Sequence, residues 1–176
     1  MNKRVLFAGF GGQGILFSGR VLANAGLVAE YEVSWVPSYG PETRGGTSNC
    51  AVVISDRAIG SPLVTTMDVL VAMNAPSYDR FIDSVVENGL AIIDSSLIDR
   101  EPVRKDIRIA KIAATTLAEV KGFRGLANMI LLGRLLSEIE LFSEKQIEEA
   151  VTLSVTAARE NLIKNNLMAI RLGMTL

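Results

Sequence analysis

The sequence predicts an α/β fold: a single Rossmann-like domain with a mostly parallel sheet, helices on both faces and a helical C-terminal part. Three observations support this prediction. Up to residue 114, apolar runs rich in Val, Ile and Leu alternate with helix-like segments, a pattern typical of buried parallel strands joined by helices. A glycine-rich loop follows the first apolar run. The length of 176 residues suits one domain, which we expect to span residues 1–176.

The N-terminal part supplies the expected sheet. Short apolar or alternating runs predict strands over 4–10, 33–39, 47–55, 67–74, 89–96 and 107–114. Helices are expected over 13–30 and 76–87. The second helix opens with Pro76, at a position where proline is tolerated. Together these segments give a sheet with helices between its strands.

From Thr115 onward the pattern is mostly helical. Residues 126–139 are apolar on nearly all sides, which predicts a helix that is either buried in the core or part of a subunit interface. Ser143 and Gln146 form a capping-box pattern. This box opens a helix whose apolar face comprises Ile147, Ala150, Val151, Val155 and Ala158. A last helix is expected over 161–173.

Composition excludes several classes of protein. The 18 Lys and Arg nearly balance the 19 Asp and Glu, so we expect no nucleic-acid partner. The chain has no histidine and one cysteine, Cys50, which excludes a Ser-His-Asp or Cys-His site within it and a cysteine cluster for zinc or iron–sulfur. We expect no metal site, and Cys50 should be a small core residue. No stretch of about 18 apolar residues exists, so we expect a cytoplasmic protein without a membrane partner.

The loop GFGGQG carries Gly9, Gly11 and Gly14 at the G-x-G-x-x-G spacing, between a strand and a helix. Such glycines allow a tight turn, the close approach of a pyrophosphate and close packing of the helix on the strand. An NAD site also needs an acidic residue after the second strand. Glu30 and Glu32 precede that strand instead. A phosphate-bearing ligand, NAD(P) and a tight turn without ligand all remain open from the residues alone.

A second polar loop, SYGPETRGGTSN, follows the expected strand 33–39. In open α/β sheets, ligands bind outside the carboxyl ends of the strands, so we expect this loop to lie beside the glycine-rich loop. Arg44 could hold an anionic group through a two-point contact, or it could tie the loop to Glu42 or to another subunit. The candidate residues of this loop are Tyr39, Gly40, Pro41, Glu42, Arg44, Gly45, Gly46, Thr47, Ser48 and Asn49.

The two loops, in this order and followed by SDRAIGSPLV and NMILLG, resemble the gamma subunit of 2-oxoacid:ferredoxin oxidoreductases over nearly the whole chain. The pattern is most similar to the 2-oxoglutarate type, with the branched-chain 2-oxoacid type next. The resemblance implies a complex that decarboxylates a 2-oxoacid on thiamine diphosphate, passes electrons through iron–sulfur clusters to ferredoxin, and forms an acyl-coenzyme A. It also implies that the gamma chain helps to bind coenzyme A and to close the active site, without being active alone.

By this resemblance, the alpha, beta and ferredoxin-like delta subunits would be partners and would carry thiamine diphosphate and the clusters. No cofactor is expected to be held by this chain alone, and no catalytic residue is assigned to it. The glycine loop would face a phosphate-bearing ligand or a neighbouring subunit through Gly9, Gly11, Gly12, Gln13 and Gly14. The second loop would lie near the shared active site, with neutral hydrogen bonds from Thr47, Ser48 and Asn49. An isolated chain could form a homodimer, since subunits that expose apolar interfaces often pair.

Two other interpretations remain beside this one. A free-standing NAD(P)-dependent dehydrogenase would bind nicotinamide cofactor as an isolated chain, although the acidic residue for the ribose and a substrate domain are missing. A module that senses a nucleotide without catalysis is the third interpretation, and the sequence separates it poorly from the first.

Overall fold

The computed structural model describes residues 1–38, 47–155 and 160–176. Within this part, six strands form one sheet in the order β2-β3-β1-β4-β5-β6. The strands are β1 (Asn2–Phe10), β2 (Glu32–Ser38), β3 (Thr47–Ser55), β4 (Met67–Ala72), β5 (Val85–Asp94) and β6 (Arg108–Ile112). The helices are α1 (Ile15–Val28), α2 (Ala75–Phe81), α3 (Ala114–Val120), α4 (Ala127–Ile139), α5 (Glu144–Ser154) and α6 (Glu160–Met174).

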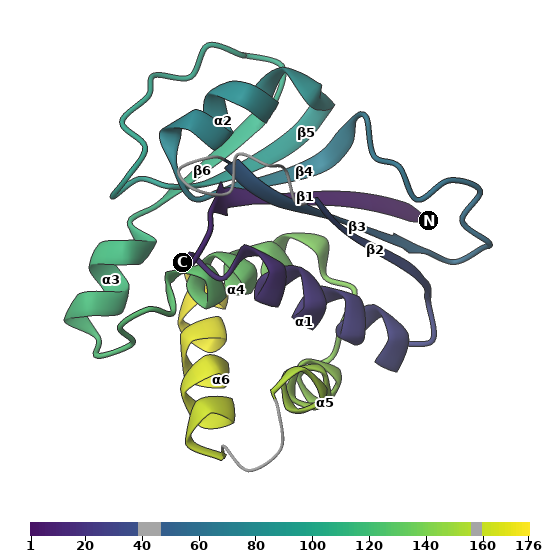
Figure 1. Cartoon of the computed structure of the whole chain (residues 1–176), viewed down its shortest axis with the longest axis vertical. Coiled ribbons are helices and arrows are strands. Elements are labelled where there is room, and N and C mark those ends of the chain that lie inside the picture. The colour runs from purple at the N-terminus through teal and green to yellow at the C-terminus, as the bar shows by residue number, and fades with distance from the viewer. Residues whose placement is uncertain (39–46, 156–159) are drawn as a thin grey trace.

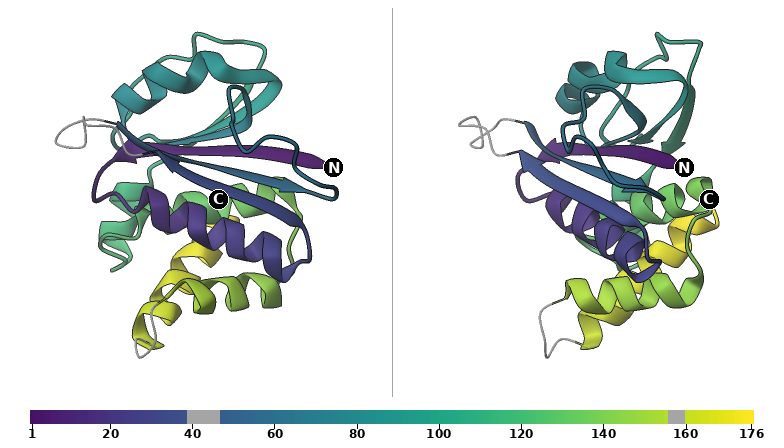
Figure 2. Two further views of the ribbon diagram at one scale, coloured as in Figure 1. Left: turned by 45° about the vertical axis from the view of Figure 1, so that its right-hand side comes forward. Right: turned by 90° about the vertical axis from the view of Figure 1, so that its right-hand side faces the viewer.

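Helices cover both faces of the sheet, as the sequence predicted. Helix α2 lies on one face, whereas α1 and α4 lie on the other (Figure 1). Helices α5 and α6 form a further layer beyond α1 and α4 (Figure 2). Within the described residues, none of the helices combines the length and the apolar character that a bilayer-spanning segment needs.

The sheet is mostly parallel, but β3 runs antiparallel to both of its neighbours, β1 and β2. The run over 47–55 predicts a strand of a mostly parallel sheet but does not by itself indicate the direction of that strand. A parallel return requires a crossover of about a dozen residues or more. Only residues 39–46 separate β2 from β3, so β3 must return beside β2 in the opposite direction.

The predicted helix over 76–87 is shorter in the structure. Asn74 caps α2 by accepting a hydrogen bond from the Ser77 amide at 2.9 Å, the arrangement preferred at a helix start. The helix ends at Phe81, a single 3₁₀ turn follows over Ile82–Ser84, and β5 begins at Val85. The strand therefore starts four residues earlier than its sequence indicates.

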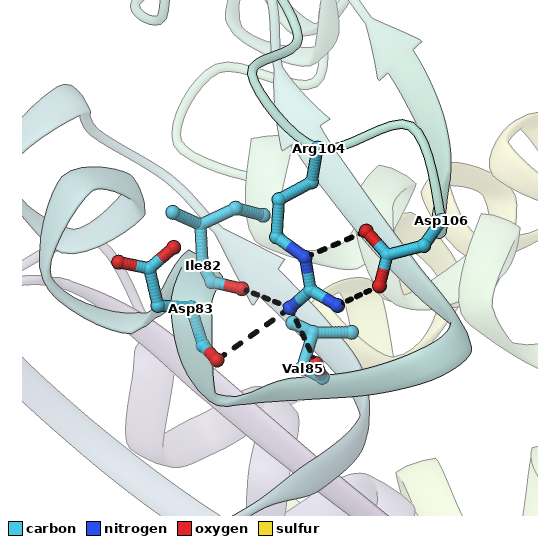
Figure 3. Close-up of polar contacts among 5 residues, drawn as sticks. All are labelled: Ile82, Asp83, Val85, Arg104 and Asp106. Atoms are coloured by element: carbon cyan, nitrogen blue, oxygen red, sulfur yellow. Dashed lines mark hydrogen bonds and ion pairs between the residues drawn. The ribbon is translucent and has the colours of Figure 1, made fainter.

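A long-range contact explains this early end. The Arg104 guanidinium donates hydrogen bonds to the carbonyls of Ile82, at 3.2 Å, and of Val85, at 2.6 Å, and it also pairs with Asp106 (Figure 3). It thereby donates to carbonyls on both sides of the point where the 3₁₀ turn ends and β5 begins. Arg104 lies 19 residues beyond Val85, so no local pattern in 76–87 could indicate the boundary.

The core has two parts, one on each face of the sheet. Along β1, Phe7 packs toward α1 and α4, whereas its neighbour Leu6 packs toward α2, the alternation of a strand buried on both faces. Helix α4 is buried along most of its length. It packs on the sheet, on α1 and on α6 within the same chain. The sequence left open whether this helix is buried in the core or forms a subunit interface. Contacts within the same chain are enough to bury it.

Candidate functional site

The glycine-rich loop joins the end of β1 to the start of α1, as the sequence predicted. Gly14 is the N-cap of α1 and has a left-handed backbone, with φ of 76°, and Gly12 has φ of 91°. L-residues other than glycine rarely adopt such angles. A side chain at Gly14 would also come within 2.8 Å of the Asn128 side-chain carbon Cγ. The loop conformation therefore favours glycine at both positions, and at Gly14 the space beside Asn128 favours it further.

Gln13 fastens this loop to the neighbouring strand. Its Oε1 accepts hydrogen bonds from the Phe10 amide, at 2.6 Å, and from Asn74 Nδ2, at 3.0 Å. Its Nε2 donates to the carbonyl of Met73, just beyond β4, at 3.1 Å. We had predicted that Gln13 contacts a ligand, and no observation tests that prediction. The hydrogen bonds give its amide a structural role in holding the loop against β4.

The open side of the loop is backbone. Gly11 and Gly12 are exposed, and no atom lies within 4 Å of the position that a side chain at Gly12 would take. Helix α1 has no side-chain cap and no acidic residue in its first turn. The first amides of a helix have no intrahelical acceptor and carry the positive end of the helix dipole. In α1 no side chain of the first turn or the cap occupies or neutralises them. This arrangement can bind an anion.

The ends of the second candidate loop lie at the same edge of the sheet. Residues 39–46 fall outside the described residues, as does the Thr47 side chain, so the predictions for Tyr39 through Thr47 stay predictions. The strand register pairs Ser38 with Asn49 and Gly9 with Ser48. Ser48 and Asn49 thus lie beside the strand that leads into the glycine loop.

The strand order argues against a dinucleotide site. In the Rossmann fold, the strand that carries the ribose-binding acid lies next to the first strand. Here β3 lies between β1 and β2, which moves β2 one interstrand spacing of about 4.8 Å further away. The described part of β2 ends at Ser38 without an acidic side chain at its carboxyl end. Among the described residues, the glycine loop is therefore present without an acidic side chain at the carboxyl end of β2 for the ribose of NAD.

A cavity of about 190 Å³ adjoins the glycine loop, and sequence reasoning did not find it. It is lined by Gly12, Gln13, Thr115, Glu119, Arg124 and Asn128, among others. Residues of the second half of the chain, around the start of α4, thus close one side of the loop. The one residue in the sequence that could have indicated this cavity is Asn128, a polar residue in the mostly apolar first half of α4.

Two buried polar residues near the sheet are explained within the chain. The Asp94 carboxylate, at the end of β5, accepts hydrogen bonds from the Ser96 amide and from the Thr115 amide and hydroxyl, so it caps the turn and the start of α3. Cys50 is fully buried, and burial raises the pKa of its thiol to about 12. The expectation of a small core cysteine is confirmed, because such a thiol is not a nucleophile near neutral pH. Among the described residues, no group of three or more His, Cys, Asp and Glu could hold a metal ion.

Comparison with known proteins gives one consistent family. The family described as pyruvate ferredoxin/flavodoxin oxidoreductase matches residues 4–176. The ketoisovalerate oxidoreductase subunit VorA of Methanothermobacter thermautotrophicus is 40% identical over 97% of this chain and 35% of its own length. The 2-oxoglutarate synthase subunit KorC of Methanocaldococcus jannaschii is 36% identical over 98% of this chain and 92% of its own length. The chain thus spans about a third of some curated relatives and nearly all of others.

Solved structures agree with this assignment. The gamma subunit of a keto/oxoacid ferredoxin oxidoreductase from Geobacter sulfurreducens has a TM-score of 0.84 and 27% identity, and 98% of this chain and 96% of that one are covered. The 2-oxoglutarate:ferredoxin oxidoreductase of Magnetococcus marinus, solved with 2-oxoglutarate, coenzyme A and succinyl-CoA bound, has a TM-score of 0.86 and 26% identity over 99% of this chain and 30% of its own. Because the match extends over residues 4–176, the chain belongs to the pyruvate ferredoxin/flavodoxin oxidoreductase family.

Proposed function

We propose that this chain is the gamma subunit of a 2-oxoacid:ferredoxin oxidoreductase of the 2-oxoglutarate type. The observation that carries the proposal is the end-to-end match to separate 2-oxoglutarate synthase subunits, which this chain covers over 92–97% of their length at 35–36% identity. Its partners would be the alpha, beta and ferredoxin-like delta subunits, with ferredoxin as electron acceptor. The complex would convert the 2-oxoacid to its acyl-coenzyme A.

Within that complex, this chain would help to bind coenzyme A and to close the active site. The residues present fit such a ligand, because the glycine loop presents bare backbone beside the uncapped first turn of α1, where phosphate groups bind well. Coenzyme A, when bound, supplies the thiol that takes up the acyl group. The chain's own contribution is to hold the phosphate end with backbone amides while other subunits hold thiamine diphosphate and the iron–sulfur clusters.

A branched-chain 2-oxoacid is the second candidate substrate. One observation favours it: the ketoisovalerate oxidoreductase subunits reach 39–40% identity over 97% of this chain, slightly above the 2-oxoglutarate synthase subunits. Those relatives are much longer than this chain. The comparable length of the 2-oxoglutarate synthase subunits is our reason for placing 2-oxoglutarate first.

The test is purification of the tagged chain from its native cell without oxygen. We expect partner subunits to co-purify, with the visible absorbance of iron–sulfur clusters. The complex should reduce ferredoxin in the presence of coenzyme A, fastest with 2-oxoglutarate among a panel that includes 3-methyl-2-oxobutanoate. A chain that purifies alone and binds NAD would refute the proposal, and a preference for 3-methyl-2-oxobutanoate would establish the second candidate.

A matched pair of variants tests the role of the glycine loop. Gly12 and Gly122 both have a left-handed backbone and open space around them, so an alanine costs each a similar backbone strain of about 1 kcal/mol. Only Gly12 lies in the glycine loop. We expect Gly12→Ala to raise the KM for coenzyme A in the complex and Gly122→Ala to leave it unchanged. Equal KM values for the two variants would remove the loop from coenzyme A binding.

A further inference from the structure

We propose that Asn74 is a positioning residue for the glycine loop: its amide oxygen caps α2, while its amide nitrogen holds Gln13 and thereby fixes the turn over residues 10–13. Asn74 is 4% exposed, so it acts through Gln13 and not by contact with a ligand. The link itself is argued from hydrogen bonds within the chain. Only its effect on coenzyme A rests on the proposed function.

Gln13 closes the turn that carries the exposed backbone of the loop. Its main-chain amide donates to the Phe10 carbonyl, at 3.2 Å, and its Oε1 accepts from the Phe10 amide, at 2.6 Å. Both main-chain groups of Phe10 are therefore bound by one residue. Gly11 and Gly12 stand between them, and Gly12 has the positive φ, 91°, that the third residue of a type II turn needs. The Gln13 side chain thus holds the end of β1 and the two exposed glycines in one conformation.

Asn74 determines which way the Gln13 amide points. Asn74 Oδ1 accepts from the Ser77 amide, at 2.9 Å, so its Nδ2 donates to Gln13 Oε1, at 3.0 Å. Gln13 Nε2 then donates to the Met73 carbonyl, at 3.1 Å. A reversed Gln13 amide would place two NH₂ groups against each other and two oxygens against each other. The cap of α2 therefore fixes the orientation of Gln13, because the Ser77 amide only donates and the Met73 carbonyl only accepts.

The first glycine of the loop leaves room for this arrangement. The backbone of Gly9 is not left-handed, so its conformation does not require glycine. A Cβ atom there would lie 2.7 Å from Gln13 Oε1 and 2.7 Å from Ile15 Cδ1, whereas ordinary contact begins at 3.4–4 Å. Three hydrogen bonds hold the Gln13 amide in this place, so it does not rotate away freely. The space that Gly9 leaves is thus occupied by the side chain that Asn74 orients.

The first test separates the two roles of Asn74 in the full chain. Asn74→Ser keeps an uncharged cap for the Ser77 amide, because serine caps helices about as well as asparagine, but it removes the donor to Gln13. Hydrogen exchange followed by NMR should show the Ser77 amide still protected. Protection of the Phe10 amide should fall about tenfold, roughly the contribution of one hydrogen bond. Gln13→Met, which removes the acceptor itself, should lower it at least as much.

Asn24→Ser is the matched control. Asn24 also donates one side-chain hydrogen bond, to Ser154 Oγ at 2.8 Å, but it lies further along α1, and its loss should leave the Phe10 amide protected. In the assembled complex, Asn74→Ser should raise the KM for coenzyme A about two- to tenfold without a change in kcat, as expected when only binding is weakened. Asn24→Ser should change neither. The effects of Asn74→Ser and Gln13→Met on KM should not add, because Asn74 acts through Gln13.

Unchanged protection of the Phe10 amide in Asn74→Ser would overturn the proposal, and so would loss of protection at Ser77 as well, since the cap and the link would then not be separable. Additive effects of Asn74→Ser and Gln13→Met on KM, or an equal rise in Asn24→Ser, would also overturn it. A complex that keeps the wild-type KM in Asn74→Ser would refute this inference and leave the proposed function standing. A complex that needs no coenzyme A would refute the proposed function, and loss of Phe10 protection would still support the link from Asn74 to the loop.

Discussion

Replacement of Gly133 by alanine should weaken the contact between α4 and α6. The two helices approach backbone to backbone at this point. A Cβ atom at Gly133 would lie 2.9 Å from the carbonyl carbon of Ile170 and 3.0 Å from the Cα of Gly173, with the Ile170 carbonyl oxygen closer still. The obstruction is backbone, so no side chain can rotate to make room.

The size of the effect follows from these distances. Ordinary contact begins at 3.4–4 Å. Because the Ile170 carbonyl oxygen is the nearest atom, the helices must separate by more than about 1 Å, and a gap of about 0.5–1 Å already forfeits a quarter to a half of the dispersion energy of a facing atom pair. Overpacking a core costs about 1–3 kcal/mol, and we expect the upper end here because α6 packs through Ala169 and Ile170, which are buried. Alanine returns about 1 kcal/mol of helix propensity. The net loss is about 2 kcal/mol, or roughly 4–8 °C in Tm for a chain of this length.

Urea denaturation followed by circular dichroism measures this loss. Gly60→Ala is the control, because Gly60 has open space and no left-handed backbone, and we expect it within about 0.5 kcal/mol of the wild type. Gly173→Ala should resemble Gly133→Ala, and the double variant should cost less than the sum, since one separation of the helices relieves both clashes. A Gly133→Ala protein as stable as the wild type would show that the backbones are not in contact.

Three further predictions concern other parts of the fold. The Cys50 thiol should not react with Ellman's reagent at pH 8 in the folded protein and should react once the protein unfolds. Its pKa is about 12 in the folded protein against an ordinary 9.0, so the free energy of unfolding should fall as the pH rises through that interval. In urea denaturation, Arg104→Ala should lower the free energy of unfolding more than Arg100→Ala does, because Arg104 also donates to main-chain carbonyls, whereas Arg100 makes an exposed ion pair with Asp79. Burial alone would raise the pKa of Asp68, but hydrogen bonds and charge from Arg4 have the larger effect, so the pKa is lowered. The resulting stability is present above the ordinary pKa of 3.8 and is lost as the pH falls below it. Asp68→Asn should therefore flatten the acid side of a plot of unfolding free energy against pH.

Local patterns in the sequence were enough to predict most elements of the fold. Apolar runs located β1, β4 and β5, and the capping box of Ser143 and Gln146 forms at the start of α5. The end of that helix was misjudged, since Val155 follows α5 as its C-cap and Ala158 lies outside the described residues. The direction of β3 could not be predicted from its own residues, because an apolar run buried between two strands looks the same in either direction. Its direction depends on the length of the connection, which the periodicity does not contain.

The candidate site was predictable only in its first half. The strand, the glycines and the helix are contiguous, so local rules located the glycine loop. Arg124 and Asn128 lie more than 100 residues further along the chain, and they reach the loop only because α4 packs against α1. Gln13 shows a second kind of long-range dependence: its place in the motif predicts a ligand contact, which stays a prediction, and its amide also bonds to Asn74 and to the Met73 carbonyl. Which side chain faces inward from such a loop depends on the neighbouring strand.

The size of the cavity connects the candidate site with the proposed role as a subunit. Sites that enclose a complete drug-sized ligand have volumes of about 300–1,000 Å³, and the cavity beside the glycine loop has about 190 Å³. It can hold a phosphate group, but a ligand as long as coenzyme A would extend beyond it. A protein that binds such a ligand alone would leave most of it in water. The same geometry suits a chain that holds one end of the ligand while a partner subunit encloses the other, so coenzyme A should bind more tightly to the assembled complex than to the isolated chain.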